Sequence, residues 1–295
     1  MTSLSYCIVN TNGAEYLPAC VEAARAGPEG EVLVLDNASD DGSGDLADIK
    51  LDRREGKAAN DSRLLRQAQG EYWLLLNEDA ELHPGAAVAL VQALDDDPGA
   101  AAVGAQLVST DGVPVPCAWR LPGVGPALAV ATGTQKLLVT QSGGTRRREV
   151  GWCQSSAMLV RRSAAEQVGY LDPDFFVYSD ETDFCKRLRD AGWRILFEPA
   201  AVATHHNQLS SDREAEARRL AEFHRNRDLY MRKHHSTAER LLTRALWVVA
   251  YLERALAGSD RARMLRHARH ELVAGSGEGV REAAEARNER VTTAG

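Results

Sequence analysis

The chain has 295 residues, 44% of them hydrophobic and 26% charged, which excludes intrinsic disorder and allows one large domain or a domain with an appendage. Its five scattered cysteines form no CxxC pair, so we expect neither a zinc cluster nor a disulfide framework, and a reducing cytoplasm fits best. No signal-peptide pattern follows Met1, and the longest uncharged apolar run, residues 245–252, is too short for a membrane-spanning helix, which needs about 20 residues.

The net charge of −7 is unevenly distributed along the chain. Residues 213–295 contain 17 Lys and Arg against 12 Asp and Glu, whereas residues 1–212 contain 18 against 30. The first part is therefore strongly acidic and the second basic, which indicates two different roles. We predict a main domain over 1–212, a helical region over 213–275 and a flexible tail over 276–295.

Strand and helix patterns alternate through the first hundred residues. Short apolar runs with β-branched residues predict strands at 5–9, 31–36, 49–52, 72–76 and 101–108. Helical spacing of apolar residues predicts helices at 14–27, 58–70 and 85–97. This alternation predicts an α/β fold with a mostly parallel sheet flanked by helices, in which ligands lie beyond the carboxyl ends of the strands.

The pattern is lost over residues 109–150, which are rich in Gly, Pro and Thr and predict a long mobile excursion. Order returns with an apolar run at 156–162, a helix at 179–191 and a strand at 193–199. From residue 211 onward the sequence is helical and basic, and the last twenty residues resemble a frayed tail.

Four polar clusters follow strands or begin helices in this pattern. Asp36 ends a strand in "VLVLDNASDDGS", where it can accept hydrogen bonds from a ligand, although a plain turn or an EF-hand-like calcium loop can also be read there. Asn77 and Asp79 end the next buried strand one residue apart, as ligands of Mg²⁺ or Mn²⁺ would, with Glu78 pointing the other way. The alternative is an acidic helix start.

The other two clusters lie late in the chain. Asp180, Glu181 and Asp183 crowd the start of a helix after the apolar "FFVY", which places a general base beside a hydrophobic pocket, although acids also complement the helix dipole there. His205 and His206 end a strand in "VATHHNQLSS", where surface histidines are the alternative. All four clusters are predicted to converge on one edge of the sheet.

Five motifs resemble family 2 glycosyltransferases, most closely the bacterial rhamnosyltransferase-like branch. They are "IVNTNGAEYL", "VLDNASDDGS", "GEYWLLLNEDAEL", "SSAMLVRRSAAEQVGYLDPDFFVYSDETDFCKRLRDAGWRI" and "THHNQLSS", in family order over about residues 4–235. The resemblance implies a GT-A fold, a nucleotide-diphosphate sugar donor (dTDP-, UDP- or GDP-linked), Mg²⁺ or Mn²⁺, and inversion at the anomeric carbon. It implies nucleotide-sugar binding within about 1–108 and acceptor binding and catalysis within about 150–212.

The resemblance also implies roles for particular residues. Glu181 would be the base, with Asp180 as the alternative because the order of the family's acid pair is reversed here. Asp79 and His205 would bind the metal, and Trp152 and Tyr178 would line the acceptor side. The donor would contact Thr11, Asn12, Asp36, Asn37, Lys57, Asn60, Asn77 and Glu78.

These expectations predict a cytoplasmic enzyme that transfers rhamnose or a similar hexose to a hydroxyl of a glycan, lipid-linked or small-molecule acceptor. The alternative is a non-catalytic module that binds nucleotide sugar or metal, because Asn77 occupies the first position of the metal motif. The basic C-terminal helices predict peripheral contact with the anionic inner face of the plasma membrane. Nucleic acid is not expected as a partner, because the main domain is acidic.

Overall fold

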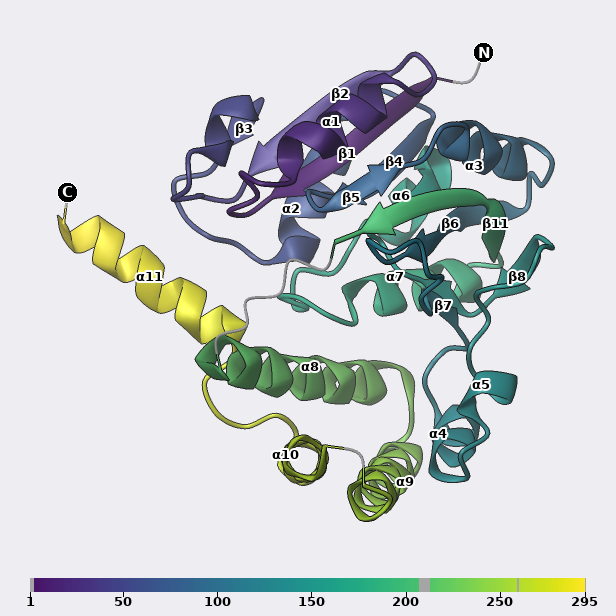
Figure 1. Cartoon of the computed structure of the whole chain (residues 1–295), viewed down its shortest axis with the longest axis vertical. Helices are drawn as coiled ribbons and strands as arrows, with labels where there is room; N and C mark the ends of the chain where they lie inside the picture. The colour runs from purple at the N-terminus through teal and green to yellow at the C-terminus, as the bar shows by residue number, and fades with distance from the viewer. Residues whose placement is uncertain (1–2, 207–212, 259, 295) are drawn as a thin grey trace. The chain divides into compact units, whose positions relative to one another are not determined.

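A computed structural model describes residues 3–206, 213–258 and 260–294 (Figure 1). The chain divides into two compact units, which are described separately. The sheet unit comprises residues 1–119, 141–174 and 180–208, and the helical unit comprises residues 120–140, 175–179 and 209–295. The helical unit therefore takes in two segments that the predicted boundary at residue 212 had left in the main domain.

Within the described residues, the sheet unit contains one nine-stranded sheet in the order β3-β2-β1-β4-β10-β6-β11-β5, with β8 paired to β11. Its strands are β1 (Leu4–Asn10), β2 (Glu31–Asp36), β3 (Ile49–Lys50), β4 (Tyr72–Asn77), β5 (Ala80–Leu82), β6 (Ala100–Val108), β8 (Arg148–Val150), β10 (Ala157–Arg161) and β11 (Arg194–His205). Strands β1, β2, β3, β4, β6 and β11 run in one direction, whereas β5, β8 and β10 run against them. The prediction of a mostly parallel sheet is confirmed.

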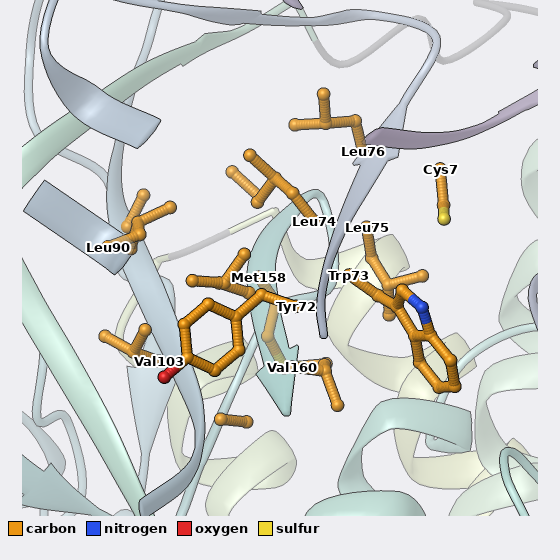
Figure 2. Close-up of a cluster of buried hydrophobic side chains, with 14 of the residues drawn as sticks. Cys7, Tyr72, Trp73, Leu74, Leu75, Leu76, Leu90, Val103, Met158 and Val160 are labelled. Carbon is orange, nitrogen blue, oxygen red and sulfur yellow. The ribbon is translucent and has the colours of Figure 1, made fainter. Parts of the chain in front are cut away.

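Strand β4 shows why the sheet carries helices on both faces. Successive side chains of a strand point to opposite sides, so Tyr72 and Trp73 leave the sheet in opposite directions (Figure 2). The Tyr72 hydroxyl donates to Asp95 of helix α3 (Ala86–Asp95), while the Trp73 ring stacks on Tyr170, which follows helix α6 (Arg162–Val168). Residues 72–76 are all buried, as the nearly continuous apolar run predicts.

The remaining helices of the sheet unit match the predicted alternation. Helix α1 (Leu17–Arg25) joins β1 to β2, and α2 (Lys57–Gln67) precedes β4. Helix α7 (Asp180–Asp190) ends before Gly192, which adopts a positive φ of 93°. A separate two-stranded sheet pairs β7 (Ala118–Trp119) with β9 (Trp152–Cys153).

The excursion over residues 109–150 contains more structure than its composition predicts. Residues 120–140 form helices α4 (Val124–Ala131) and α5 (Gln135–Leu138), which belong to the helical unit. Helix α4 buries Ala127, Ala129 and Val130, and it contacts helix α9 (Thr237–Leu256). The small apolar side chains of this segment therefore form a packed helix, which the flanking Gly and Pro residues hide in the sequence.

Helices α8 (Arg213–His234), α9, α10 (Arg261–Leu272) and α11 (Val280–Ala294) complete the helical unit. The prediction of a frayed tail over 276–295 is corrected here, because α11 occupies most of that range. The Gly279 N–H donates to the Glu282 carboxylate, and Arg225 of α8 forms an ion pair with the same carboxylate at 2.7 Å. These contacts hold the first turn of α11. Among the described residues, no helix is long and apolar enough to cross a membrane.

Candidate active site

The polar ends of four strands meet at one edge of the sheet. Asn10 ends β1 and stands opposite Asp36 at the end of β2, while Val9 stands opposite Asn77 at the end of β4. His205 ends β11 and pairs with Ala80 of β5, directly after Asp79. Three of the four predicted clusters, those of Asp36, of Asn77 and Asp79, and of His205, therefore lie at strand ends on one edge of the sheet unit.

Asp36 lies in a closed hydrogen-bond network. Its Oδ1 accepts from the Asn10 amide at 2.7 Å and from the Ser39 hydroxyl at 2.5 Å, and its Oδ2 accepts from the Ser39 backbone N–H at 3.0 Å. The Asn10 amide also donates to Ser43. The alternative of a turn is thus realised by Asp36 and Ser39, which leaves Asp36 4% exposed at the edge of the site.

The loop after β1 is fixed to the same network. Asn37 donates to the Thr11 hydroxyl at 3.3 Å and pairs with the backbone of Glu55 in both directions. Asn12 adopts a positive φ of 55°, and its side-chain oxygen accepts from the Asp40 N–H at 2.8 Å. Asn12 and Asn37 therefore fix this loop by bonding to backbone groups, and the Thr11 hydroxyl accepts from the Asn37 amide.

Asn77, Asp79 and His205 form a compact set of potential metal ligands. The His205 Nε2 lies 3.2 Å from the Asp79 Oδ1 and 3.4 Å from the Asn77 amide nitrogen, which donates to Ser156 at 3.0 Å. The buried Asn77 Oδ1 has no hydrogen-bond partner. A carboxylate, an imidazole and an unpaired amide oxygen fit Mg²⁺ or Mn²⁺, since an orphaned buried oxygen ordinarily requires a partner.

The protein supplies few charged ligands for such an ion. Within the described part of the chain, no group of three or more His, Cys, Asp and Glu residues is arranged to hold a metal. The Asn77, Asp79 and His205 set therefore does not by itself complete the octahedral coordination that Mg²⁺ prefers.

Glu78 adopts a different environment from its neighbours. Burial, followed by the negative charge of Asp79, raises the pKa of Glu78 to about 7. Its side chain lies against Gly13, where an added Cβ would come within 2.7 Å of the Glu78 Cγ. Glu78 thus packs against Gly13 of the loop after β1.

The start of α7 brings three carboxylates and one ammonium together. The Lys57 Nζ at the start of α2 donates to Asp61 at 2.6 Å and to the Ser155 hydroxyl at 3.2 Å. Burial opposes the charge of Lys57, but the carboxylates of Asp61, Asp180 and Glu181 together raise its pKa. Lys57 therefore stabilises negative charge on the acid pair. From the sequence, Lys57 was expected only to contact the donor.

The pKa of Glu181 is strongly perturbed. Burial, together with the charge of the neighbouring Asp180, raises the pKa of Glu181 well above its ordinary value, and the charge of Lys57 partly opposes this rise. Asp180 is 1% exposed, and its Oδ2 has no hydrogen-bond partner. A buried carboxyl group with a raised pKa next to an unsatisfied carboxylate oxygen is typical of general acid and base sites.

Asp183 differs from the other acids of α7. It is fully buried and accepts from the Arg187 guanidinium at 2.7 Å, one helical turn later. Arg187 in turn donates to the backbone carbonyls of Val168 and Tyr170. Asp183 thus forms an ion pair within α7.

Asn60 and the aromatic acceptor residues complete the predicted set. The Asn60 amide is fully buried, and neither its oxygen nor its nitrogen has a partner. Trp152 stacks on Trp119 across the β7–β9 pair, with ring centroids 4.5 Å apart. Tyr178 belongs to the helical unit, where its ring meets Phe223 edge to face at 6.0 Å.

The histidine cluster divides in two. His205 is 7% exposed and joins Asp79, whereas His206 pairs with Glu81 at 2.7 Å and packs on the Tyr16 ring. Residues 207–211 of the "THHNQLSS" motif lie outside the described residues.

Five residues of the site were not singled out from the sequence. Asn10, Ser155 and Ser156 lie inside quoted motifs and Asp61 lies inside the predicted helix at 58–70, but nothing in their spacing distinguishes them from structural residues. Ser155 and Ser156 join the site by accepting hydrogen bonds from Lys57 and Asn77, and Trp119 joins it through the pairing of β7 with β9. Only the tertiary structure reveals these contacts.

Comparison with known proteins identifies similar chains. A family model described as glycosyl transferase family 2 matches residues 5–169. The chain is 31% identical over 186 residues to the N-acetylglucosaminyl-diphospho-decaprenol L-rhamnosyltransferase of Mycobacterium tuberculosis, covering 57% of this chain and 58% of that relative. It is 42% identical over 57 residues to the rhamnosyltransferase WbbL of Escherichia coli, covering 19% of this chain and 22% of WbbL.

Solved structures show the same fold at low identity. GalNAc-T7 with UDP, GalNAc and Mn²⁺ gives a TM-score of 0.57 at 15% identity, covering 78% of this chain and 50% of that one. The mannosyltransferase PcManGT from Pyrobaculum calidifontis, with GDP-Man and Mn²⁺, gives 0.55 at 16% identity, covering 100% and 81%. The predicted GT-A fold is thereby confirmed.

Proposed function

This chain belongs to glycosyl transferase family 2, and from that membership we propose that it is an inverting glycosyltransferase that moves a hexose from a nucleotide diphosphate to an acceptor hydroxyl. The observation that carries the proposal is that one sheet unit holds both the Asn77, Asp79 and His205 set and Glu181 of α7, whose pKa is raised. A metal-assisted displacement by an acceptor hydroxyl uses a cation site and a base.

For the donor, we propose a nucleotide-diphosphate sugar carrying rhamnose or a similar hexose. The relatives in Mycobacterium tuberculosis and Escherichia coli are named as rhamnosyltransferases, and two structures with the same fold contain UDP or GDP-Man. Thr11, Asn12 and Asn37 shape the loop that would receive the nucleotide, together with Asp36. The unpartnered Asn60 amide offers a further donor and acceptor for the phosphate or sugar.

Asn77, Asp79 and His205 would hold Mg²⁺ or Mn²⁺. When bound, the ion supplies Lewis-acid stabilisation of the negative charge that develops on the departing diphosphate. The protein itself orients these three side chains. Asn77 is held by its hydrogen bond to Ser156, and His205 is held by its contact with Asp79. Because the set is incomplete, the ion should bind weakly until the diphosphate adds its oxygens.

Glu181 is the proposed base, with Asp180 as the alternative. It would take the proton of the acceptor hydroxyl as that oxygen attacks the anomeric carbon. Because the pKa of Glu181 is raised, its carboxylate form, and therefore kcat/KM, should increase as the pH rises through that pKa. Beside Glu181, the ammonium group of Lys57 forms an ion pair with the Asp61 carboxylate.

For the acceptor, we propose a hydroxyl on a lipid-linked or glycan saccharide. The Mycobacterium tuberculosis relative is named for a decaprenol diphosphate substrate, and this chain spans 58% of that relative's length. The stacked Trp119 and Trp152 rings offer a flat surface of the kind that packs against a sugar ring.

The test is the release of nucleotide from a panel of nucleotide sugars with Mn²⁺ or Mg²⁺ and with EDTA. Replacing the base costs roughly 10²- to 10⁴-fold, so Glu181→Gln should fold, bind donor and lose at least that much turnover. The exposed Glu71→Gln serves as the matched control in the same unit and should keep full turnover.

Asp180→Asn run in parallel distinguishes the two candidate bases, since only the base variant should lose the rise of kcat/KM with pH. Donor binding without any metal-dependent release of nucleotide would instead identify a non-catalytic binding module. Tight metal binding by the protein without nucleotide would contradict the proposed incomplete site.

A further inference from the structure

Helix α9 turns an apolar stripe toward solvent. Its large exposed hydrophobic side chains are Leu241, Leu242, Val249, Leu252 and Leu256, with exposed fractions from 41% to 84%. Residues 242, 249 and 256 are seven positions apart, which is about two helical turns. Residues 245 and 252 lie three or four positions from them, so all five lie on one side of the helix. Two of the remaining exposed positions on this side are alanines, at 238 and 245, and the charged Glu253 stands at its border.

The inward side of the same helix combines the buried residues Thr243, Ala250, Tyr251 and Ala255 with arginine contacts. The Arg240 guanidinium forms a bidentate ion pair with the Asp228 carboxylate of α8, with N···O distances of 2.7 and 2.8 Å. Arg244 donates to the Glu271 carbonyl at the end of α10. A helix of a water-soluble protein normally points its apolar stripe at the core and its charges at water. Helix α9 departs from this pattern, because its large apolar side chains remain exposed on the outer side, and that surface suits a non-aqueous neighbour.

Helix α10 packs beside α9 and adds positive charge. Arg261, Arg266 and Arg269 are exposed, as are Leu265 and Leu272, which are 43% and 66% exposed. Its only acidic residue, Glu271, is buried against Arg227 and His224. The exposed side chains of α10 therefore mix arginines with leucines, and Arg266 lies 3.6 Å from the Glu216 carboxylate of α8.

The segment on the other side of α9 has the same character. Helix α4 contacts α9, and Arg254 of α9 donates to Gln135 of α5 at 2.8 Å. Leu128, Leu137 and Leu138 of α4 and α5 are 51%, 83% and 49% exposed, beside the exposed Lys136. Exposed apolar side chains thus occur on three neighbouring parts of the helical unit, which marks an interaction surface.

We propose that the outer face of α9 and α10 binds the surface of an anionic lipid bilayer, with α9 lying in the plane of the interface. We call this surface the α9–α10 face and define it by Leu242, Val249, Leu252, Leu256, Leu265, Leu272, Arg261, Arg266 and Arg269. An apolar helical face flanked by arginines matches the acyl chains and anionic headgroups of such a surface. No described helix can cross the bilayer, so the contact is peripheral.

Charge decides against a second copy of this chain as the occupant. Residues 213–295 hold 17 basic against 12 acidic residues, and the exposed charges of α10 are all positive. Two such faces would bring like charges together. An anionic bilayer complements both the apolar and the basic side chains. This proposal goes beyond the transferase activity and does not rest on it, because vesicle binding is measured without turnover.

The apolar arm of the test uses sedimentation of the full chain with vesicles of phosphatidylcholine containing about one third phosphatidylglycerol. We expect the intact protein to co-sediment, and Leu242→Glu/Leu252→Glu to lower its partition at least tenfold. Val88→Glu/Val113→Glu is the matched control, because these side chains are 52% and 59% exposed and lie in the sheet unit. It should bind like the intact protein. Circular dichroism checks that both variants are folded.

The basic arm varies charge and salt. Each arginine near an anionic surface contributes about fivefold in partition, so Arg261→Gln/Arg269→Gln should lower binding on the order of 20-fold at low salt. Arg261→Lys/Arg269→Lys should restore it. Binding should also weaken as salt rises.

Four outcomes would overturn the proposal. They are no binding of the intact chain to anionic vesicles at low salt, equal binding to pure phosphatidylcholine, loss of binding in the Val88/Val113 control, and a dimer in solution that Leu242→Glu/Leu252→Glu converts to a monomer. The last would assign the face to a second copy.

Discussion

In the sheet unit the leucines of β4 are buried beneath helices on both faces, whereas in the helical unit the leucines of α9 face solvent and its arginines face the neighbouring helices. The interior of the helical unit also holds a charged cluster, in which Arg227, His224 and Glu271 meet beside buried apolar side chains such as Tyr230 and Tyr251. The comparison shows that the helical unit combines apolar burial with buried charge, whereas the core around β4 in the sheet unit is apolar.

We expect the largest loss of stability when one charge is removed from the interior of the helical unit. Glu271→Gln leaves Arg227 buried without its carboxylate, and breaking a buried pair costs about 3–5 kcal/mol. Trp247 reports the change by fluorescence, because the Arg227 guanidinium lies 4.4 Å from its ring centroid. The exposed Glu253→Gln is the control and should change stability by less than about 0.5 kcal/mol.

The apolar side of the comparison is tested with two leucines. Leu75→Ala in the core of the sheet unit should lower the free energy of unfolding by about 2–5 kcal/mol, because it leaves a cavity. Leu256→Ala in the helical unit should change it by less than about 0.5 kcal/mol, since Leu256 is 84% exposed. Denaturant titrations of both variants measure the contrast. Similar losses in the two variants would contradict it.

Acid should weaken the helical unit through its buried histidines. Burial lowers the pKa of His224 to about 4 and that of His267 to about 3, so both stay neutral in the folded state while the unfolded chain takes up protons below about pH 6.5. Stability is therefore full above pH 6.5 and declines as the pH falls toward the folded pKa values. Between pH 7.5 and 5 the loss should be on the order of 2 kcal/mol per histidine.

Trp247 fluorescence during denaturant titrations at several pH values measures that slope. His267→Phe removes one of the two titrating groups and should flatten the dependence. A variant slope equal to that of the intact protein would mean that Glu271 and Arg227, which face these histidines, set the response instead.

The smallest expected effect on stability comes from removing the N-cap of α9. Ser236 caps α9 in a capping box with Glu239, and removing an N-cap costs about 1 kcal/mol. Ser236→Ala should lower the midpoint of unfolding accordingly, while the adjacent Thr237→Ala should have less than half that effect. Equal effects of the two substitutions would show that tertiary contacts, and not the cap, set the start of the helix.

Strands and helices were predictable where the period of the sequence is strong. The runs at 5–9, 31–36 and 72–76 became β1, β2 and β4 with small shifts at their ends. Residues 109–150 and 276–295 were less readable, because Gly, Pro and charged residues mask the helices there. Those helices depend on contacts such as Arg225 with Glu282, which lie 57 positions apart.

The sequence by itself determined the fold class and the placing of Asn77, Asp79, His205 and the acid pair at strand and helix ends, because period-two runs and capping residues are local signals. Only the tertiary structure decided which of these groups are paired. It joined Asp183 to Arg187, bound Asp36 to Asn10 and Ser39, and brought Lys57 to Ser155, 98 positions away. It also turned the leucines of α9 outward. Hydrogen-bond partners and buried faces follow from strand register and helix packing, which act between segments that are distant in sequence.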